Sequence, residues 1–241
     1  MNDTRISIQN GTRPVILVVP HIDKDVANMV ESCASMLDCY TVINNGFIRS
    51  KDVDARNDLA DCNRIDHVKQ PVVQDEFWQP IAKMKRQIEA RFWRQNSQIL
   101  YDKCLIFYVR AFHWTNMRDK DGQEADVVVG YGAGPDPHRD NYTCSLWRRN
   151  LFVHLWRATS LVNKTPGDIY VGKRGGKFAG RNPNNINQYY RNEKRDSFVQ
   201  SMQLSFNRKL LTPKTSLNLA VIIEEMLDRS SFEEQPMLKA I

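Results

Sequence analysis

The chain has 241 residues and a formal net charge of +6, with 41% hydrophobic and 26% charged residues. This is the composition of a globular protein with one large domain or two small ones. No apolar run approaches the ~20 residues of a membrane span. The polar residues 1–14 also lack the apolar segment of a secretory signal. We therefore expect a cytoplasmic protein without a membrane partner.

The first predicted strand is 15–19, an uninterrupted apolar run between two prolines. Such a run is typical of a strand buried on both faces. His21, Asp23 and Asp25 follow directly, at the end of the strand where open α/β sheets bind ligands. Imidazole and carboxylate form a zinc-compatible ligand set. Either aspartate could instead be the N-cap of the next helix.

The rest of the chain alternates between helical periodicity and short apolar runs. We predict helices at 26–37, 72–98, 146–161 and 214–228, and further strands at 39–43, 104–112, 126–130, 168–172 and 197–206. Without repeats or a low-complexity linker, this order predicts one α/β domain with a mixed or largely parallel sheet. We expect a flexible arm over 1–13, the domain over 14–230 and a tail over 231–241.

A second histidine, His113, comes directly after the predicted strand 104–112. Two strand ends in one sheet can lie side by side, so His21, a carboxylate and His113 could converge on a metal ion. Three protein ligands and a water are the pattern of a catalytic zinc site. Taken alone, His113 could equally be a half-buried histidine bonded to a backbone carbonyl.

The polar segment 47–67 suits a site loop and contains Arg56 and Arg64, with Asp61 and Asn63 between them. One guanidinium could hold a carboxylate in a bidentate fork. The other could stabilise charge on a polarised carbonyl oxygen. The same composition also fits a solvated charged loop.

Several short motifs occur in the order found in one group of enzymes. The R-x4-D-x-N-R pattern of 56–64 is similar to segments of aspartoacylase, succinylglutamate desuccinylase and the N-formylglutamate amidohydrolases. The strand end Val-Val-Pro-His (18–21), the segment YVGKRGGKFAG (170–180), Asn184-Asn185 and Gln203-Leu204 resemble the last of these families. The likeness covers roughly residues 14 to 210. These families are carboxypeptidase-like zinc hydrolases.

The resemblance implies a single-domain, three-layer sandwich of the phosphorylase/hydrolase-like type. It also implies a zinc-dependent amidohydrolase that cleaves an amide in a small N-acyl amino acid or related carboxylate. His21 and His113 would bind Zn²⁺, and the zinc would activate water. Arg56 would polarise the scissile carbonyl, and Asn63 with Arg64 would bind the substrate carboxylate.

Two positions depart from the family pattern. The family commonly has a Glu three residues after the first histidine, where this chain has Lys24. We take Asp23 as the middle ligand, with Asp25 and, more remotely, Glu31 as alternatives.

The family's general-base Glu corresponds here to Ser205, whose hydroxyl cannot accept the proton from zinc-bound water. Either another carboxylate serves as base, with Glu193 the nearest candidate, or the alignment fails, or hydrolysis has been lost. In the last case the protein would be a degenerate member that binds or senses an anionic ligand. Arg139 could add an anion contact or lie in a surface turn.

The positive charge fits either nucleic acid or a small anionic substrate. Because no recognisable nucleic-acid module accompanies it, we favour the small substrate. The five cysteines are irregularly spaced and include no CxxC. This argues against a disulfide framework and a Cys-rich zinc module.

Overall fold

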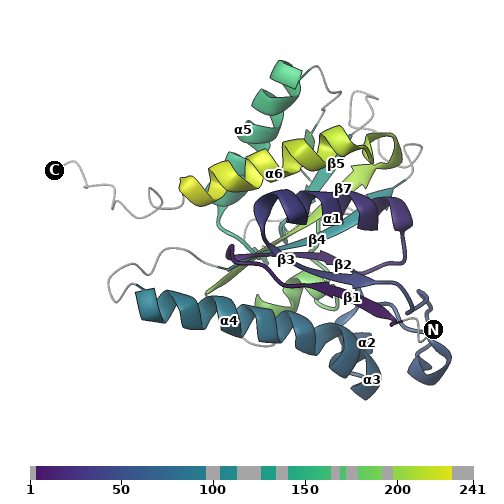
Figure 1. The fold of residues 1–241 in the computed structure, drawn as a ribbon. Helices are drawn as coiled ribbons and strands as arrows, with labels where there is room; N and C mark the ends of the chain where they lie inside the picture. Colours follow the sequence, from purple (N-terminus) through teal and green to yellow (C-terminus); the bar gives the residue numbers. More distant parts are fainter. Residues whose placement is uncertain are drawn as a thin grey trace.

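A computed structural model of the chain describes residues 4–95, 104–112, 126–133, 141–163, 169–171, 179–191 and 198–229. Its centre is a seven-stranded sheet with the strand order β1-β3-β2-β4-β7-β5-β6 (Figure 1). The strands are β1 Ile6–Gln9, β2 Val15–Val19, β3 Tyr40–Asn44, β4 Cys104–Phe112, β5 Val127–Gly130, β6 Ile169–Val171 and β7 Val199–Asn207.

The four central strands β3, β2, β4 and β7 run parallel to one another. The edge strand β1 is antiparallel to β3, and β5 is antiparallel to β7 but parallel to β6. The carboxyl ends of β2, β3, β4 and β7 therefore meet at one edge of the sheet. The turn that follows β2 and the last residues of β4 lie at this edge.

Helices cover both faces of the sheet, as Figure 1 shows. On one face lie α1 (Lys24–Leu37), α5 (Leu146–Asn163) and α6 (Pro213–Asp228). On the other lie α2 (Ile65–Val68), α3 (Pro71–Val73) and α4 (Gln79–Gln95). Alternate residues of β2 enter the two cores, Leu17 on the α1 side and Ile16 on the α4 side. The predicted α/β sandwich with a mixed, largely parallel sheet is confirmed.

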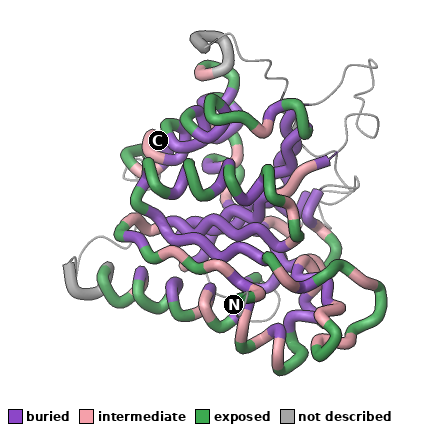
Figure 2. The backbone as a smooth tube through the Cα atoms, turned by 45° about the vertical axis from the view of Figure 1, so that its right-hand side comes forward, coloured by how far each residue is buried: buried purple, intermediate pink, exposed green. Residues whose placement is uncertain are grey.

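The sheet is the most buried part of the backbone, as Figure 2 shows. Every residue of β2 and β3 is buried, which agrees with the apolar runs in the sequence. The five cysteines are also buried, and none of them is in a disulfide bond. Within the described ranges, no helix is long and apolar enough to cross a membrane.

Three local predictions differ from the structure. The expected flexible arm includes β1, because Ile6 packs into the core and Arg5 forms ion pairs with Asp58 at 2.5 Å and Glu76 at 2.7 Å. The predicted helix 72–98 begins instead with α3 and a π-helical turn, Gln74–Trp78, before α4. The polar segment 47–67 contains a short 3-10 helix, Ala55–Asn57, and the start of α2.

Candidate functional site

A polar hollow of about 940 Å³ lies at the carboxyl ends of β2 and β4. Three segments distant in sequence close it: the turn after β2, the loop after β3, and residues 182–185. Its lining is rich in basic and amide side chains. The lining residues are His21, Arg49, Ser50, Lys51, Asp61, Asn63, Arg64, Arg110, Ala111, Phe112, Asn182, Asn184 and Asn185.

The pocket is organised around the buried carboxylate of Asp61, which is 5% exposed. Its Oδ1 lies 3.2 Å from His21 Nε2 and accepts the Asn63 backbone N–H at 3.0 Å. Its Oδ2 lies 3.2 Å from Arg49 Nε. Burial raises the pKa of Asp61, but the hydrogen bond and charge of His21, the Asn63 N–H and Arg49 outweigh it. The net pKa lies below the usual value.

An ionised Asp61 can only accept hydrogen bonds, so His21 donates through Nε2–H. This contact fixes the histidine tautomer and leaves the Nδ1 lone pair available. A histidine that binds a metal typically donates its other ring N–H to a carboxylate in the same way. His21 therefore has the orienting partner that a metal ligand needs.

The position of His21 is set by Asn44, at the end of the neighbouring strand β3. The Asn44 side-chain amide donates to the carbonyls of Pro20 at 3.0 Å and Phe47 at 2.8 Å. Its oxygen accepts the backbone N–H of Gly46 and of Phe47. One buried side chain thus joins the turn that precedes His21 to the loop that follows β3.

A second histidine, His67, holds the backbone of Asp61 in place. The Asp61 N–H donates to Nδ1 of His67 at 2.9 Å, and His67 is 2% exposed. Burial lowers the pKa of His67, which keeps the ring neutral and Nδ1 able to accept. His67 therefore supports the loop and does not face the pocket directly.

Arg64 lines the pocket but already holds a carboxylate of the protein. Its Nε and Nη2 bind the two oxygens of Asp66 at 3.1 and 2.6 Å. This fork lowers the pKa of Asp66 to about 2, with a further contribution from Asn184. Asn63 is different, because its side-chain oxygen is buried and has no hydrogen-bond partner. The buried oxygen of Asn63 is not accessible from the pocket, although other atoms of the residue line it.

The structure does not bring every predicted residue to this pocket. The side chain of Arg56 is 90% exposed, lies 3.6 Å from Asp54 and is not among the described lining residues. Asp23 caps α1 by accepting the Val26 N–H and forms an ion pair with Arg208 at 2.5 Å.

Asp25 also faces Arg208, at 3.5 Å, and Glu31 is exposed on α1. His113, Arg139 and Glu193 lie outside the described residues.

Three basic residues that the sequence reasoning missed line the pocket, namely Arg49, Lys51 and Arg110. Arg49 contacts Asp61, as described above. Arg110 lies near the C-terminal end of β4. The signal for Arg110 was present, since it is a charged residue inside the apolar run 104–112. Charged residues inside a buried strand are uncommon and need partners.

Ser205 is fully buried and is not among the described residues that line the pocket. It pairs with Arg110 across β4 and β7, and its hydroxyl accepts from Arg110 Nε at 2.9 Å. The side chain that the sequence resemblance aligned with a general base therefore contacts a guanidinium group and does not line the pocket.

The described residues supply one well-oriented metal ligand. Nowhere in the described ranges do three or more His, Cys, Asp or Glu side chains form a group that could hold a metal. The donor chemistry of His21 fits a zinc ligand, whereas Asp23 is engaged by Arg208 and the α1 N-terminus. A complete zinc site would need His113.

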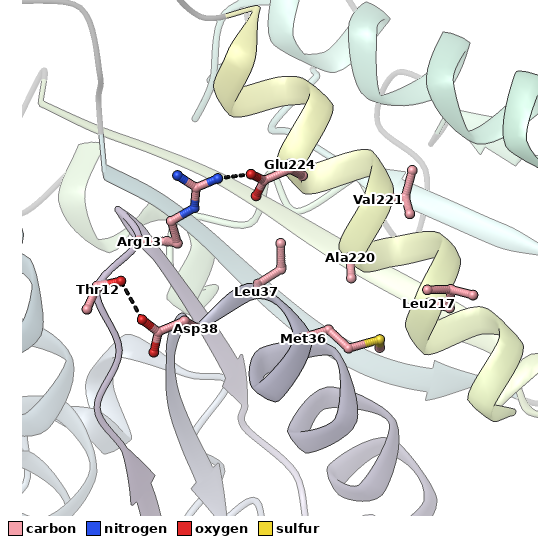
Figure 3. A pocket seen from close by; sticks show the side chains of 9 residues that line it. All are labelled: Thr12, Arg13, Met36, Leu37, Asp38, Leu217, Ala220, Val221 and Glu224. Atoms are coloured by element: carbon pink, nitrogen blue, oxygen red, sulfur yellow. Dashed lines mark hydrogen bonds and ion pairs between the residues drawn. The ribbon is translucent and has the colours of Figure 1, made fainter.

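A second hollow, of about 540 Å³, lies between the C-terminal part of α1 and α6 (Figure 3). Its apolar side chains include Met36, Leu217 and Val221, and an ion pair between Arg13 and Glu224 crosses its rim. Its described lining residues include no histidine or cysteine.

The fold belongs to the class of α/β sandwiches, and solved structures with a similar arrangement exist. The gene product Atu2144 from Agrobacterium tumefaciens matches with a TM-score of 0.50 and 10% identity, over 96% of this chain and 97% of that one. YndL in its zinc-free apo form matches with a TM-score of 0.44 and 12% identity, over 95% and 93%. No family model and no curated protein matches the chain. At this identity, the first likeness shows the fold alone.

Proposed function

We propose that the protein is a zinc-dependent amidohydrolase of the N-formylglutamate amidohydrolase-like group. Its substrate would be a small N-acyl amino acid or a related carboxylate. The observation that carries the proposal is the contact of 3.2 Å between His21 Nε2 and the buried Asp61, at the wall of a basic pocket. The motifs in the sequence support the same activity.

In this proposal His21 and His113 hold the zinc, which supplies a Lewis acid and an activated water when bound. Asp61 orients His21 and remains ionised. Asn63 lines the pocket and would contact the substrate there. Arg49 and Arg110 attract the anionic end of the substrate, a role that the sequence had suggested for Asn63 and Arg64.

A second function is favoured by one specific observation. Asp61 is the single carboxylate among the described lining residues, and its oxygens already accept from His21, Asn63 and Arg49. A general base needs a carboxylate that can accept a proton from water. Without Glu193 or another acid in that role, the protein would bind an anionic ligand and not hydrolyse it.

The test uses the full-length protein, purified without chelator, and a panel of N-formyl and N-acetyl amino acids. We expect release of free amine that stops when zinc is removed and returns when zinc is restored. The His21→Ala variant should lose both zinc and activity. The matched control is His154→Ala, since His154 is exposed on α5.

The results separate the two functions. Amine release that depends on zinc and His21 supports the hydrolase. Binding of the same compounds without amine release supports the binding protein. A folded protein that neither takes up zinc nor binds any of the compounds contradicts both.

A further inference from the structure

The outer surface of α6 carries a stripe of exposed and partly exposed residues. Lys214, Leu217, Val221 and Glu224 follow one another at intervals of three, four and three, which places their side chains along one face of the helix. Leu217 is 51% exposed and Val221 is 46% exposed, whereas Leu219, on the opposite face, is fully buried. The helix therefore has an apolar face in the core and a second, smaller one at the surface.

The neighbouring helix α1 extends this apolar surface. Met36, near the end of α1, is 49% exposed. Together with Leu217, Ala220 and Val221 it lines the hollow of about 540 Å³ between the two helices (Figure 3). Such a hollow can receive an apolar side chain of a partner helix, as a hole receives a knob in coiled-coil packing.

The two ends of the α6 stripe carry opposite charges. Lys214 lies three residues before Leu217, and Glu224 lies three residues after Val221. An ion pair with Arg13 holds the Glu224 carboxylate at the rim of the hollow (Figure 3). A stripe with a cation at one end and a carboxylate at the other is complementary to itself after a rotation of 180°. An antiparallel copy of α6 would thus place lysine opposite glutamate and leucine opposite valine.

We propose that Met36 and the α6 stripe form the interface of a two-fold symmetric homodimer, in which α6 packs antiparallel against α6 of a second copy. The charge pattern favours a second copy as the occupant, because each charged residue of the stripe meets the opposite charge of the same stripe. The apolar pairs at the centre exclude water. The lysine–glutamate pairs at the two ends fix the direction and register of the helices.

This interface lies away from the β2/β4 pocket. The hollow is bordered by Arg13 and Asp38, which precede β2 and β3, whereas His21 follows the carboxyl end of β2. The lining residues of the hollow and of the pocket do not overlap. The dimer would leave the pocket open, and the inference does not rest on the proposed function.

The first experiment measures association of the full-length protein by sedimentation velocity and light scattering. We expect a reversible dimer over about 1–500 µM, the range in which small interfaces dissociate. Leu217→Glu should weaken it by at least about 10-fold, because symmetry places the new carboxylate in the apolar centre twice. The matched control is Leu146→Glu on α5, where a leucine that is 42% exposed lies outside the interface. This variant should associate like the wild type.

The second experiment exchanges the charges at the ends of the stripe, at low ionic strength, where exposed charges are least screened. Lys214→Glu and Glu224→Lys each place like charges opposite one another twice, and each should weaken the dimer by about 3- to 30-fold. When the two variants are mixed in equal amounts, both pairs are opposite in charge again. The mixture should therefore associate about as well as the wild type, which a loss of stability in either variant cannot produce.

Circular dichroism and thermal unfolding of each variant separate loss of association from loss of fold. Recovery of association in the mixture supports the antiparallel pairing, and a mixture that associates no better than the separate variants overturns it. Dimerisation that is unchanged in a folded Leu217→Glu protein also overturns the inference. So does a wild-type protein that stays monomeric over the whole range, which would leave this surface to a different partner.

Discussion

Replacing Asp61 by Asn removes the charge at the centre of the pocket while keeping the shape of the side chain. The carboxylate accepts from His21, the Asn63 N–H and Arg49 at 3.0 to 3.2 Å. The asparagine side chain keeps one acceptor oxygen, but its NH2 group can only donate. That group would face N–H groups of His21, Asn63 or Arg49, which are themselves donors. Because a hydrogen bond to a charged group contributes about 1.5–3 kcal/mol, we expect the free energy of unfolding to fall by about that amount.

For a chain of this size, that loss corresponds to a decrease of about 3–12 °C in Tm. Arg49 is largely exposed, so solvent screens its share and most of the loss comes from His21 and Asn63. Urea unfolding and thermal unfolding measure the stability. Zinc titration should show an affinity lower by about 10- to 100-fold, since the partner that orients His21 is weakened.

The control for this experiment is Asp52→Asn, an exposed carboxylate in the same loop. It should change neither stability nor zinc affinity. If Asp61→Asn has the same stability and zinc affinity as the wild type, then the Asp61–His21 contact does not organise the site, and the reasoning is refuted.

Three further predictions concern single residues. Asp23→Asn should keep the N-cap of α1, because Asn is also a good N-cap residue. It should also leave the zinc affinity unchanged; a large loss of zinc would show that Asp23 is a ligand. Gly132→Ala should destabilise by about 2 kcal/mol or more, measured by urea unfolding, because Gly132 has φ +89° and a Cβ would lie 1.8 Å from the Asn141 carbonyl oxygen. The folded-state pKa of Asp66, about 2, lies below its unfolded value, so the Arg64 contact stabilises above about pH 4 and is lost as pH falls toward 2. The stability difference between wild type and Asp66→Asn should therefore shrink over that range, from about 1 kcal/mol or less for this exposed pair; a constant difference contradicts the assignment.

The sheet could be predicted because its strands are continuous apolar runs, which few other structures accommodate. The position of His21 at a strand end followed from the same pattern. The edge strand β1 could not be predicted in this way, because its residues ISIQ alternate over only four positions. Its place depends on pairing with β3 and on the ion pairs of Arg5, contacts that are distant in sequence.

The site was predicted less completely than the sheet, because its decisive contacts are long-range. Asp61 meets His21 across 40 positions, and Arg110 meets Ser205 across 95. The local sequence instead suggested two alternative roles for Asp23, a metal ligand or the N-cap of the following helix. The described structure has the N-cap, together with an ion pair to Arg208 that no local pattern indicates.

The central claim is that His21, oriented by Asp61, forms part of a zinc centre at the mouth of a basic pocket. Elemental analysis of the full-length protein, purified without chelator and dialysed, tests it most directly. The account predicts zinc in an equimolar amount, lost in a folded His21→Ala protein and retained in His154→Ala. A folded wild-type protein that contains no zinc and takes none up on addition would contradict it.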